Sequence, residues 1–375
     1  MENNPPPMSE IPPSFHTPPP VITAPPPTRP PRRWGWIIVS IILFLALAVS
    51  MMINIGSAFS GLGDAGGRHH HAGPRFDEVV VTEHSGSDKI AVVPIEGIIS
   101  SHSGDRSGYN MVEVVKSQLK LAKDDEDVKA VILRVDSPGG EVLASDDIAN
   151  ELRTFQEESS KPVVVSMGSL AASGGYYVSA PCEWIVANEL TITGSIGVIM
   201  HGYNYRGLMD KIGLKPDVYK SGKFKDMLSG DRNAAEVLPE ERVMVQKLID
   251  ETYGKFKQVV GDGRAAARDM NKDGRTLVKN WAEFADGRVF SGKEAKELGF
   301  VDELGGFDTA VKRAQKLAKI KGDASIIEYR QRMDLADLFG ILGKTEAPVV
   351  KVDIGMSAPK LEAGRMYFIA PTFLP

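Results

Sequence analysis

Residues 128–140 read VKAVILRVDSPGG, and this stretch indicates the fold most clearly. Its first part, Val128 to Val135, is a short apolar run of the kind that forms a strand buried in a parallel sheet. Asp136-Ser137-Pro138-Gly139-Gly140 follows directly, and a glycine pair lets backbone amides turn outward without obstruction by a Cβ atom. Because ligands of open parallel sheets gather at the carboxyl ends of the strands, this turn marks the expected place of a site.

Strand-like and helix-like segments alternate along the rest of the chain from about residue 88. The apolar patterns predict strands at residues 89–99, 128–135, 162–166, 184–187, 195–200 and 217–220. They predict helices at residues 111–123, 142–157, 235–260 and 308–319, and a further helix that begins at Ala171. Repeated β–α–β units predict an α/β fold with a parallel sheet, helices on both faces and right-handed crossovers.

A second glycine-rich turn follows the predicted strand that ends near Ser166. It reads GSLAASGGYY over residues 168–177 and places Ser173 at the start of a helix. A serine beside outward-facing amides suits nucleophilic attack, because the developing oxyanion needs preorganised donors. The alternative is that both turns are plain connections from strand to helix, and composition alone favours neither interpretation.

A serine hydroxyl needs an adjacent proton acceptor before it can act as a nucleophile. His201, at a predicted strand end, is the one histidine beyond residue 102. Lys220, Lys223 and Lys225 form the other candidate group. A lysine can serve as a general base when desolvation draws its pKa far below the reference of about 10.4. The alternative is that these three lysines form a solvated edge.

The first 56 residues differ in composition from the rest of the chain. Residues 1–33 hold 13 of the 24 prolines, which predicts an extended or disordered tail. Residues 34–56 carry no charge and are long enough for a transmembrane helix across a hydrocarbon core of about 30 Å. Arg32 and Arg33 precede this span, so we expect the tail in the cytoplasm and the later residues outside. The alternative is a signal peptide cleaved near Ala58.

Three segments are expected beyond this span. Residues 57–87 are mostly small and polar, which predicts a linker, and a glycine context around His69 to His71 lacks the fixed geometry of a metal site. Residues 88–330 form the predicted main domain. Residues 331–375 form a C-terminal extension, of which 343–375 should be irregular or short β.

Charge and cysteine content exclude several classes of function. The chain has 375 residues, with 44 Lys+Arg against 49 Asp+Glu, and this mild acidic balance argues against a nucleic-acid partner. The single cysteine, Cys182, excludes an intramolecular disulfide framework and a cysteine-cluster zinc site. The fold must therefore be stabilised by burial of apolar surface.

Several spaced motifs together resemble one family. They are Ser137-Pro138-Gly139-Gly140, residues 171–177 (AASGGYY), Thr193-Gly194-Ser195-Ile196-Gly197, Gly222-Lys223-Phe224-Lys225, residues 285–292 (ADGRVFSG) and residues 298–302 (LGFVD). In their sequence and order they resemble the signal peptide peptidase A family over about residues 89–320. The resemblance covers neither the proline-rich tail nor the last residues of the chain.

The resemblance implies a serine peptidase domain of the Clp protease/crotonase-like parallel-sheet fold, with a serine–lysine dyad. Ser173 matches the family's nucleophile. Lys225 matches the general base, because the family's base is the lysine that closes the short turn after the glycine matched by Gly222. Asp226 then stands where double-length members often have serine.

The resemblance also assigns supporting roles. Ser195 is implied to hydrogen-bond the lysine and to orient its amine. The Gly174 N–H, together with a Gly139 or Gly140 N–H, is implied to form the oxyanion hole. No metal and no cofactor are implied.

The function implied is that of a serine endopeptidase anchored in the cytoplasmic membrane, with its catalytic domain outside. Its peptide substrates would be cleaved signal peptides left in the bilayer. Since single-unit members assemble their dyad from neighbouring subunits, a homo-oligomeric ring is expected. The alternatives are an inactive membrane scaffold of the same fold, a crotonase-like acyl-CoA enzyme, which the outward topology disfavours, and a Ser–His–Asp mechanism through His201.

Overall fold

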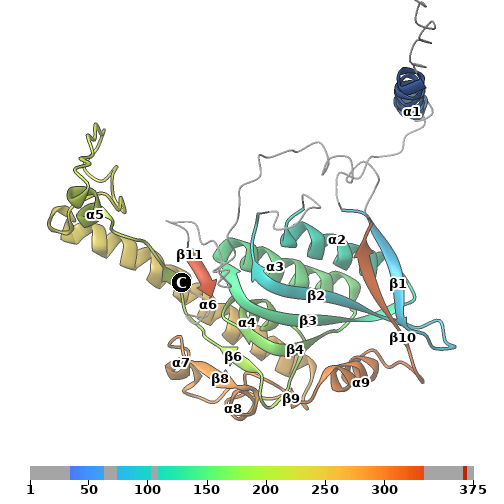
Figure 1. Cartoon of the computed structure of the whole chain (residues 1–375). Coiled ribbons are helices and arrows are strands. Elements are labelled where there is room, and N and C mark those ends of the chain that lie inside the picture. Colours follow the sequence, from blue (N-terminus) through green and yellow to red (C-terminus); the bar gives the residue numbers. More distant parts are fainter. Residues whose placement is uncertain (1–33, 63–73, 103–108, 333–365, 370–375) are drawn as a thin grey trace, which may run out of the picture. The chain divides into compact units, whose positions relative to one another are not determined.

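A computed structural model describes residues 34–62, 74–102, 109–332 and 366–369 (Figure 1). The chain divides into two units, residues 1–71 and 72–375. The predicted proline-rich tail, the three adjacent histidines and most of the C-terminal extension lie outside the described residues.

The first unit contains helix α1 (Trp34–Leu62). Side chains of this helix are described over residues 37–51, and nearly all of them are exposed. Among the residues that the structure describes, no helix combines the length and the apolar character that a membrane span requires.

The second unit is built on a mostly parallel sheet. Across the sheet, the strands are β1 (Phe76–Thr82), β10 (Ser325–Gln331), β2 (Lys89–Ile99), β3 (Val128–Glu141), β4 (Val163–Ala172), β5 (Trp184–Ala187) and β9 (Glu303–Leu304). Strand β1 is antiparallel to β10, and the pairings from β10 to β9 are all parallel. The mostly parallel sheet predicted from the β–α–β pattern is thus confirmed.

Four short strands extend the sheet near the carboxyl ends of β3 and β4. Strand β6 (Ile192–Gly194) is parallel to the end of β4, and β8 (Val289–Ser291) is antiparallel to β6. Strand β11 (Met366–Ile369) is antiparallel both to the end of β3 and to β7 (Ile199–Met200). These additions surround the place where the two glycine-rich turns end.

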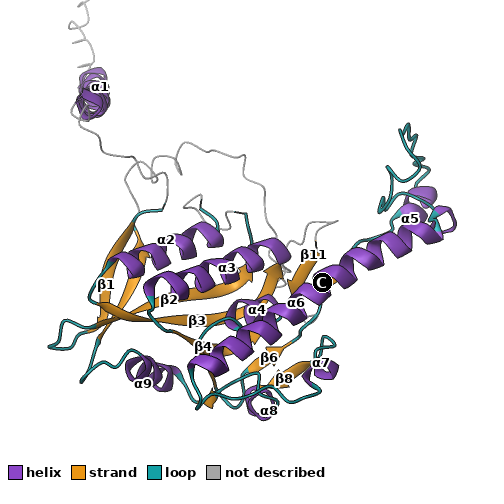
Figure 2. Cartoon of the chain, turned by 180° about the vertical axis from the view of Figure 1, so that it is seen from behind, coloured by secondary structure: helices purple, strands orange, loops and turns teal. Residues whose placement is uncertain are grey.

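Helices cover both faces of the sheet (Figure 2). One core contains side chains from α2 (Met111–Asp124), α3 (Val142–Ser159), α4 (Gly174–Ser179) and α6 (Pro239–Met270), and the other contains side chains from α9 (Phe307–Leu317). The remaining helices are α5 (Arg206–Lys211), α7 (Trp281–Phe284) and α8 (Gly292–Glu297).

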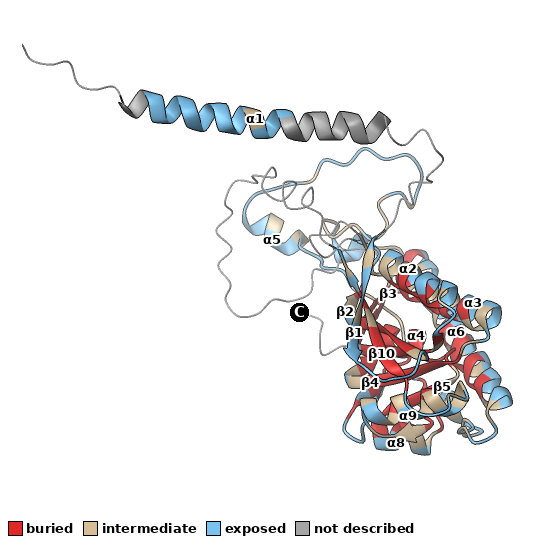
Figure 3. Ribbon diagram, turned by 90° about the vertical axis from the view of Figure 1, so that its right-hand side faces the viewer, coloured by how far each residue is buried: buried red, intermediate tan, exposed pale blue. Residues whose placement is uncertain are grey.

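Alternate residues of each central strand enter the two cores. In β3, Val131 and Leu133 belong to the core that includes α2 and α3, whereas Ala130 and Ile132 belong to the core that includes α9. A strand buried on both faces reads as a continuous apolar run, which explains the sequence of residues 128–135. Figure 3 shows this concentration of buried residues in the sheet.

The structure differs from the predicted elements where the presence or absence of a pairing strand determines whether a segment forms a strand. Residues 217–220, predicted as a strand, contain none and are exposed, so that prediction was wrong. Residues 76–82 lie inside the predicted linker but form β1, because β10 supplies a partner far away in the sequence. The predicted strand 195–200 is a strand only at residues 199–200.

One buried ion pair joins α6 to the segment that precedes β9. The Arg264 guanidinium donates to the Asp302 carboxylate, and both side chains are 1% exposed. Asp302 also accepts from the backbone amide of Ile185 at 2.9 Å, and Arg264 donates to the Cys182 carbonyl at 3.0 Å. The pair therefore ties α6 to the two strands at this edge of the sheet.

Replacing Asp302 with alanine should lower the free energy of unfolding by about 3–5 kcal/mol, because it leaves a buried guanidinium without its counter-charge. Urea denaturation followed by circular dichroism measures this change. Asp286→Ala is the matched control, since Asp286 pairs with Arg288 on the surface, where both side chains are about half exposed. Equal midpoints for the two variants would contradict the expectation.

Candidate active site

Ser173 occupies the single residue between the end of β4 and the start of α4. Its backbone has φ +54°, in the region that side chains rarely adopt, and its amide donates to the Gly194 carbonyl at 2.8 Å. The residue is 1% exposed, and its hydroxyl oxygen has no hydrogen-bond partner among the described residues. Buried hydroxyls are normally hydrogen-bonded, so an unpartnered one at a strained turn is a candidate for function.

The two glycine-rich turns lie against each other beside Ser173. A Cβ atom on Gly174 would lie 3.0 Å from the Gly139 Cα and 3.1 Å from the Gly140 nitrogen. Gly139 has φ +99°, and its own amide donates to the Ser137 hydroxyl at 3.0 Å. The three glycines named by the sequence motifs are thus close neighbours, and a Cβ atom at Gly174 would collide with the facing turn and, at 2.7 Å, with the Ser145 hydroxyl.

Ser195 follows directly after β6 and is 3% exposed. Ala172 of β4 pairs with Gly194 of β6. Ser173 and Ser195 each follow directly after one member of this pair, at the ends of two adjacent parallel strands. The Ser195 amide donates to the Arg288 carbonyl at 2.7 Å, which fixes the turn from the other side. The structure thus brings two of the predicted site residues, Ser173 and Ser195, into one neighbourhood.

Lys225 lies in the segment between α5 and α6. This segment projects together with α5 and the N-terminal end of α6 (Figures 1 and 2). This segment bonds mainly to itself and to the first turn of α6. Lys223 pairs with Glu240 at 3.3 Å, and Arg232 donates to Glu241 at 3.0 Å. The Lys225 side chain is exposed, and no ion pair joins it to another described residue.

The neighbouring acid is held by other cations. Lys220 binds the Asp226 carboxylate at 2.7 Å, and Arg232 approaches it at 3.5 Å. The hydrogen bond from Lys220 lowers the pKa of Asp226 below its ordinary value. The Asp226 carboxylate therefore pairs with Lys220 and Arg232 of the projecting segment and not with Lys225.

The length of α6 separates Lys225 from Ser173 within one chain. Glu240, next to the lysine segment, is sixteen positions before Phe256, whose ring packs against Tyr177 of α4. At ~1.5 Å rise per residue, this part of α6 spans about 24 Å. The structure therefore does not bring the two predicted dyad residues together in a single copy of the chain.

His201, the other candidate base, lies beyond β7. Its ring is 4.8 Å from the ring of Tyr203, and no hydrogen bond connects it to Ser173 among the described residues. Single-chain geometry thus provides Ser173 with neither candidate base.

A strand lies on the first glycine turn, and the sequence did not predict it there. Strand β11 pairs with residues Gly139 to Glu141, at the very end of β3. A short strand within residues 343–375 was among the predictions, and β11 confirms that part. Its place beside the candidate site was not foreseen, because a four-residue apolar run carries no information about its partner.

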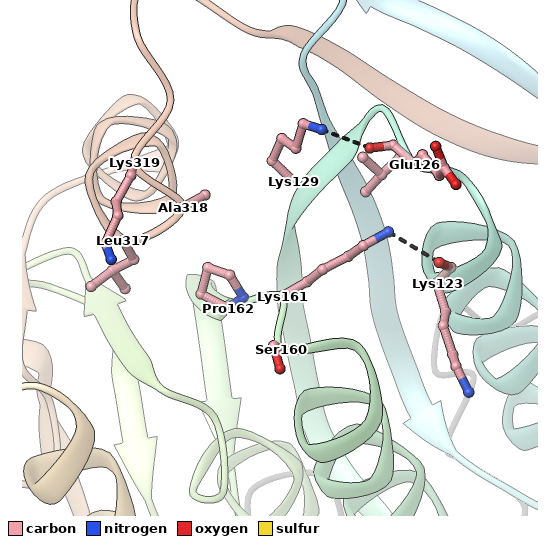
Figure 4. Close-up of a pocket in the computed structure, with 10 residues that line it drawn as sticks. Lys123, Glu126, Lys129, Ser160, Lys161, Pro162, Leu317, Ala318 and Lys319 are labelled. Carbon is pink, nitrogen blue, oxygen red and sulfur yellow. Dashed lines mark hydrogen bonds between the residues drawn. The ribbon is translucent and has the colours of Figure 1, made fainter.

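A separate pocket lies at the opposite ends of β3 and β4 and is lined by several lysines (Figure 4). The Lys161 amine donates to the carbonyls of Ala122 at 2.8 Å and Asp125 at 2.7 Å. Burial lowers the pKa of Lys161. The amine thus closes the C-terminal end of α2, which is a structural role. Within the described residues, no group of three histidine, cysteine or acidic side chains could hold a metal ion.

Comparisons with known proteins assign the family. The profile of "Peptidase family S49" matches residues 156–321, which include Ser173, Ser195 and Lys225. "Putative protease slr0021" of Synechocystis is 43% identical over 237 residues, 63% of this chain and 76% of that protein. "Putative signal peptide peptidase SppA" of Enterococcus faecium is 38% identical over 257 residues, 68% of this chain and 70% of that protein.

A longer relative matches over part of its length. "Protease 4" of Haemophilus influenzae is 35% identical over 242 residues, which are 64% of this chain and 37% of that protein. The chain belongs to peptidase family S49, the family of the signal peptide peptidase A enzymes, and is a serine protease.

Proposed function

We propose that this protein is a membrane-anchored endopeptidase in which Ser173 is the nucleophile and Lys225 of a neighbouring copy is the general base. The observation that carries the proposal is the Ser173 hydroxyl, which is buried, lacks a partner among the described residues and adjoins the glycine turns. A serine poised in this way lacks only a proton acceptor.

In the proposed reaction, the Ser173 oxygen attacks the carbonyl carbon of the scissile peptide while the lysine amine accepts the hydroxyl proton. The resulting oxyanion is bound by the Gly174 and Gly140 amides; Gly140 is preferred to Gly139 because the Gly139 amide already donates to Ser137. The lysine then gives its proton to the leaving amine. A water molecule, deprotonated by the same lysine, hydrolyses the acyl-enzyme and regenerates Ser173.

A second copy is the proposed source of the lysine because the projecting segment exposes many apolar side chains. The residues concerned are Tyr203 (64% exposed), Leu208 (61%), Ile212 (67%), Tyr219 (90%), Leu228 (56%) and, on α6, Val243 (68%). Large apolar patches on a soluble surface mark interaction sites. Packing of this segment on a neighbour would cover the patch and could carry Lys225 to the neighbour's Ser173, as in a homo-oligomeric ring.

The proposed substrates are hydrophobic peptides, in particular signal peptides left in the membrane after cleavage. The printed name of the Enterococcus relative supports this substrate class. The uncharged stretch at residues 34–56, within which α1 exposes apolar side chains, supports an anchor in the cytoplasmic membrane with the peptidase domain outside. Residues 34–56 would then hold the site close to its substrates.

A serine-directed phosphonate probe tests the proposal against an inactive scaffold of the same fold. The assembled full-length protein should become labelled once per chain, and peptide mapping should place the label on Ser173 rather than on Ser195 or Ser179. Labelling should rise in step with loss of peptidase activity. A folded, oligomeric protein that cleaves no peptide and takes no label at Ser173 would support the scaffold instead.

A further inference from the structure

An acid follows the candidate base in the chain. Asp226 comes directly after Lys225, in a run of turns between α5 and α6. A carboxylate beside an amine favours the ammonium form, and an ammonium group cannot accept a proton. Unless the acid is held by other groups, it should therefore hinder the proposed role of Lys225.

Lys220 and Arg232 hold the Asp226 carboxylate. The Lys220 amine donates to both carboxylate oxygens, at 2.8 and 2.7 Å, and the Arg232 guanidinium lies 3.5 Å from one of them. The hydrogen bond from Lys220 lowers the pKa of Asp226, so the carboxylate stays ionised in this position. The Asp226 side chain is only 14% exposed, whereas Lys225 next to it is exposed. The acid is therefore directed toward two cations of the same segment.

Arg232 ties the same acid to α6. Its guanidinium donates to both oxygens of the Glu241 carboxylate, at 3.1 and 3.0 Å. The side chains of Arg232 and Glu241 are 11% and 3% exposed, so salt screens this ion pair much less than it screens a surface pair. Arg232 also donates to the backbone carbonyl of Asp226 at 3.3 Å. The turn that carries Lys225 is therefore anchored to the first turn of α6.

Other charged groups near the proposed dyad are bound to partners of their own. Lys223 pairs with Glu240 of α6 at 3.3 Å. The elements around Ser173 contribute further bound groups: Asp136 with the Leu170 amide, His102 with Glu141, Asp146 with the Tyr177 hydroxyl, and Arg288 with Asp286. Asp226 is the acid next to Lys225 in the chain, so its partners determine which charge lies beside the amine.

We propose that Lys220 is a positioning residue for the general base: it holds the Asp226 carboxylate and so leaves the Lys225 amine able to accept a proton. The inference rests on the proposed function, since it takes Lys225 to be the base that serves Ser173 of a neighbouring copy. Arg232 keeps the acid within reach of Lys220 by fixing the turn to α6. Without the Lys220 amine, the released carboxylate would stabilise the ammonium form of the base.

The pH profile of peptide cleavage tests this role in the assembled full-length protein. Lys220→Met should move the acid limb of kcat/KM upward by about one pH unit, because more of the base is then ammonium at a given pH. Below the limb, kcat/KM should be about tenfold lower than in the wild type. Lys220→Arg keeps the cation and should keep the wild-type limb. The Lys220 side chain is 37% exposed, so both replacements should leave the fold intact.

Two further variants show whether the shift comes from the acid. Asp226→Asn in the Lys220→Met protein should bring the limb back to the wild-type position or below it, because no carboxylate is left beside the base. Lys223→Met is the matched control: it removes the same charge two positions from Lys225, but Lys223 pairs with Glu240, so the limb should stay in place. An unchanged limb in Lys220→Met, or a shift that Asp226→Asn does not reverse or that Lys223→Met reproduces, would overturn the inference.

A second measurement does not depend on cleavage. In the assembled Ser173→Ala protein, acetic anhydride modifies Lys225 at a rate that follows the fraction of neutral amine, and peptide mapping at several pH values reads this rate. Lys220→Met in this background should shift the profile upward by the same amount as the acid limb. Profiles that coincide with and without the Lys220 amine would count against the inference.

These outcomes are separable from those of the proposed function. If Lys225→Ala is inactive but Lys220→Met cleaves with the wild-type pH profile, Lys225 is the base and only the role of Lys220 is wrong. If Lys225→Ala cleaves peptide at the wild-type rate, the proposed function itself is wrong.

Discussion

Replacing Ser173 with alanine should reduce peptide cleavage by about 10⁴-fold or more, since the attacking oxygen is lost and water alone must replace it. The assembled protein should stay folded, because the hydroxyl makes no hydrogen bond with the described residues whose loss would cost stability. Initial rates on an unstructured apolar peptide, measured with wild-type protein in parallel, give the ratio.

Ser179→Ala provides the matched control for this change. Ser179 ends α4, the short helix that begins directly after Ser173, and is also buried, but its hydroxyl donates to the Gly175 carbonyl within α4. It should retain most of the activity, while the melting temperatures of both variants stay close to that of the wild type. Near-normal turnover by the Ser173 variant would remove Ser173 from the mechanism.

The central sheet could be predicted because local patterns determine it. The apolar runs at Val128–Val135 and 162–166 mark doubly buried strands, and the glycines that follow mark where the strands end in turns. The structure shows that β3 and β4 continue through these turns to Glu141 and Ala172. They do so because β2 and β11 pair with the end of β3 and β6 pairs with the end of β4, and β11 comes from a remote part of the sequence.

The candidate site could be predicted only in part. Ser173, Gly139 and Gly174 follow from strand-end positions in adjacent parallel strands, so short-range patterns and sheet topology place them together. Lys225 has no such constraint, since its segment pairs with no strand of the sheet. Whether the base comes from the same chain or from a neighbouring copy depends on how the chains associate. No local pattern of residues encodes this association.

Lys225→Ala should lower the rate of peptide cleavage by about 10²- to 10⁴-fold, the usual contribution of a positioned general base. Lys225→Arg should be equally impaired, because a guanidinium keeps its proton and cannot accept another. Lys223→Ala, two positions away, is the matched control: Lys223 pairs with Glu240 on the surface and should be dispensable. His201→Ala should also retain turnover, whereas its inactivity would favour the Ser–His–Asp alternative.

Mixing two inactive variants shows whether the lysine acts on another copy. When Ser173→Ala and Lys225→Ala chains are unfolded together and reassembled in equal amounts, an intact serine should meet an intact lysine of its neighbour in about a quarter of the sites, as random cyclic association requires. Activity should therefore return to roughly that fraction of the wild-type value. Within a single chain, α6 keeps Lys225 and Ser173 apart, so each variant reassembled alone should stay inactive. If the mixed assembly also remains inactive while wild-type chains treated in the same way recover, Lys225 is not the base that serves a neighbouring Ser173.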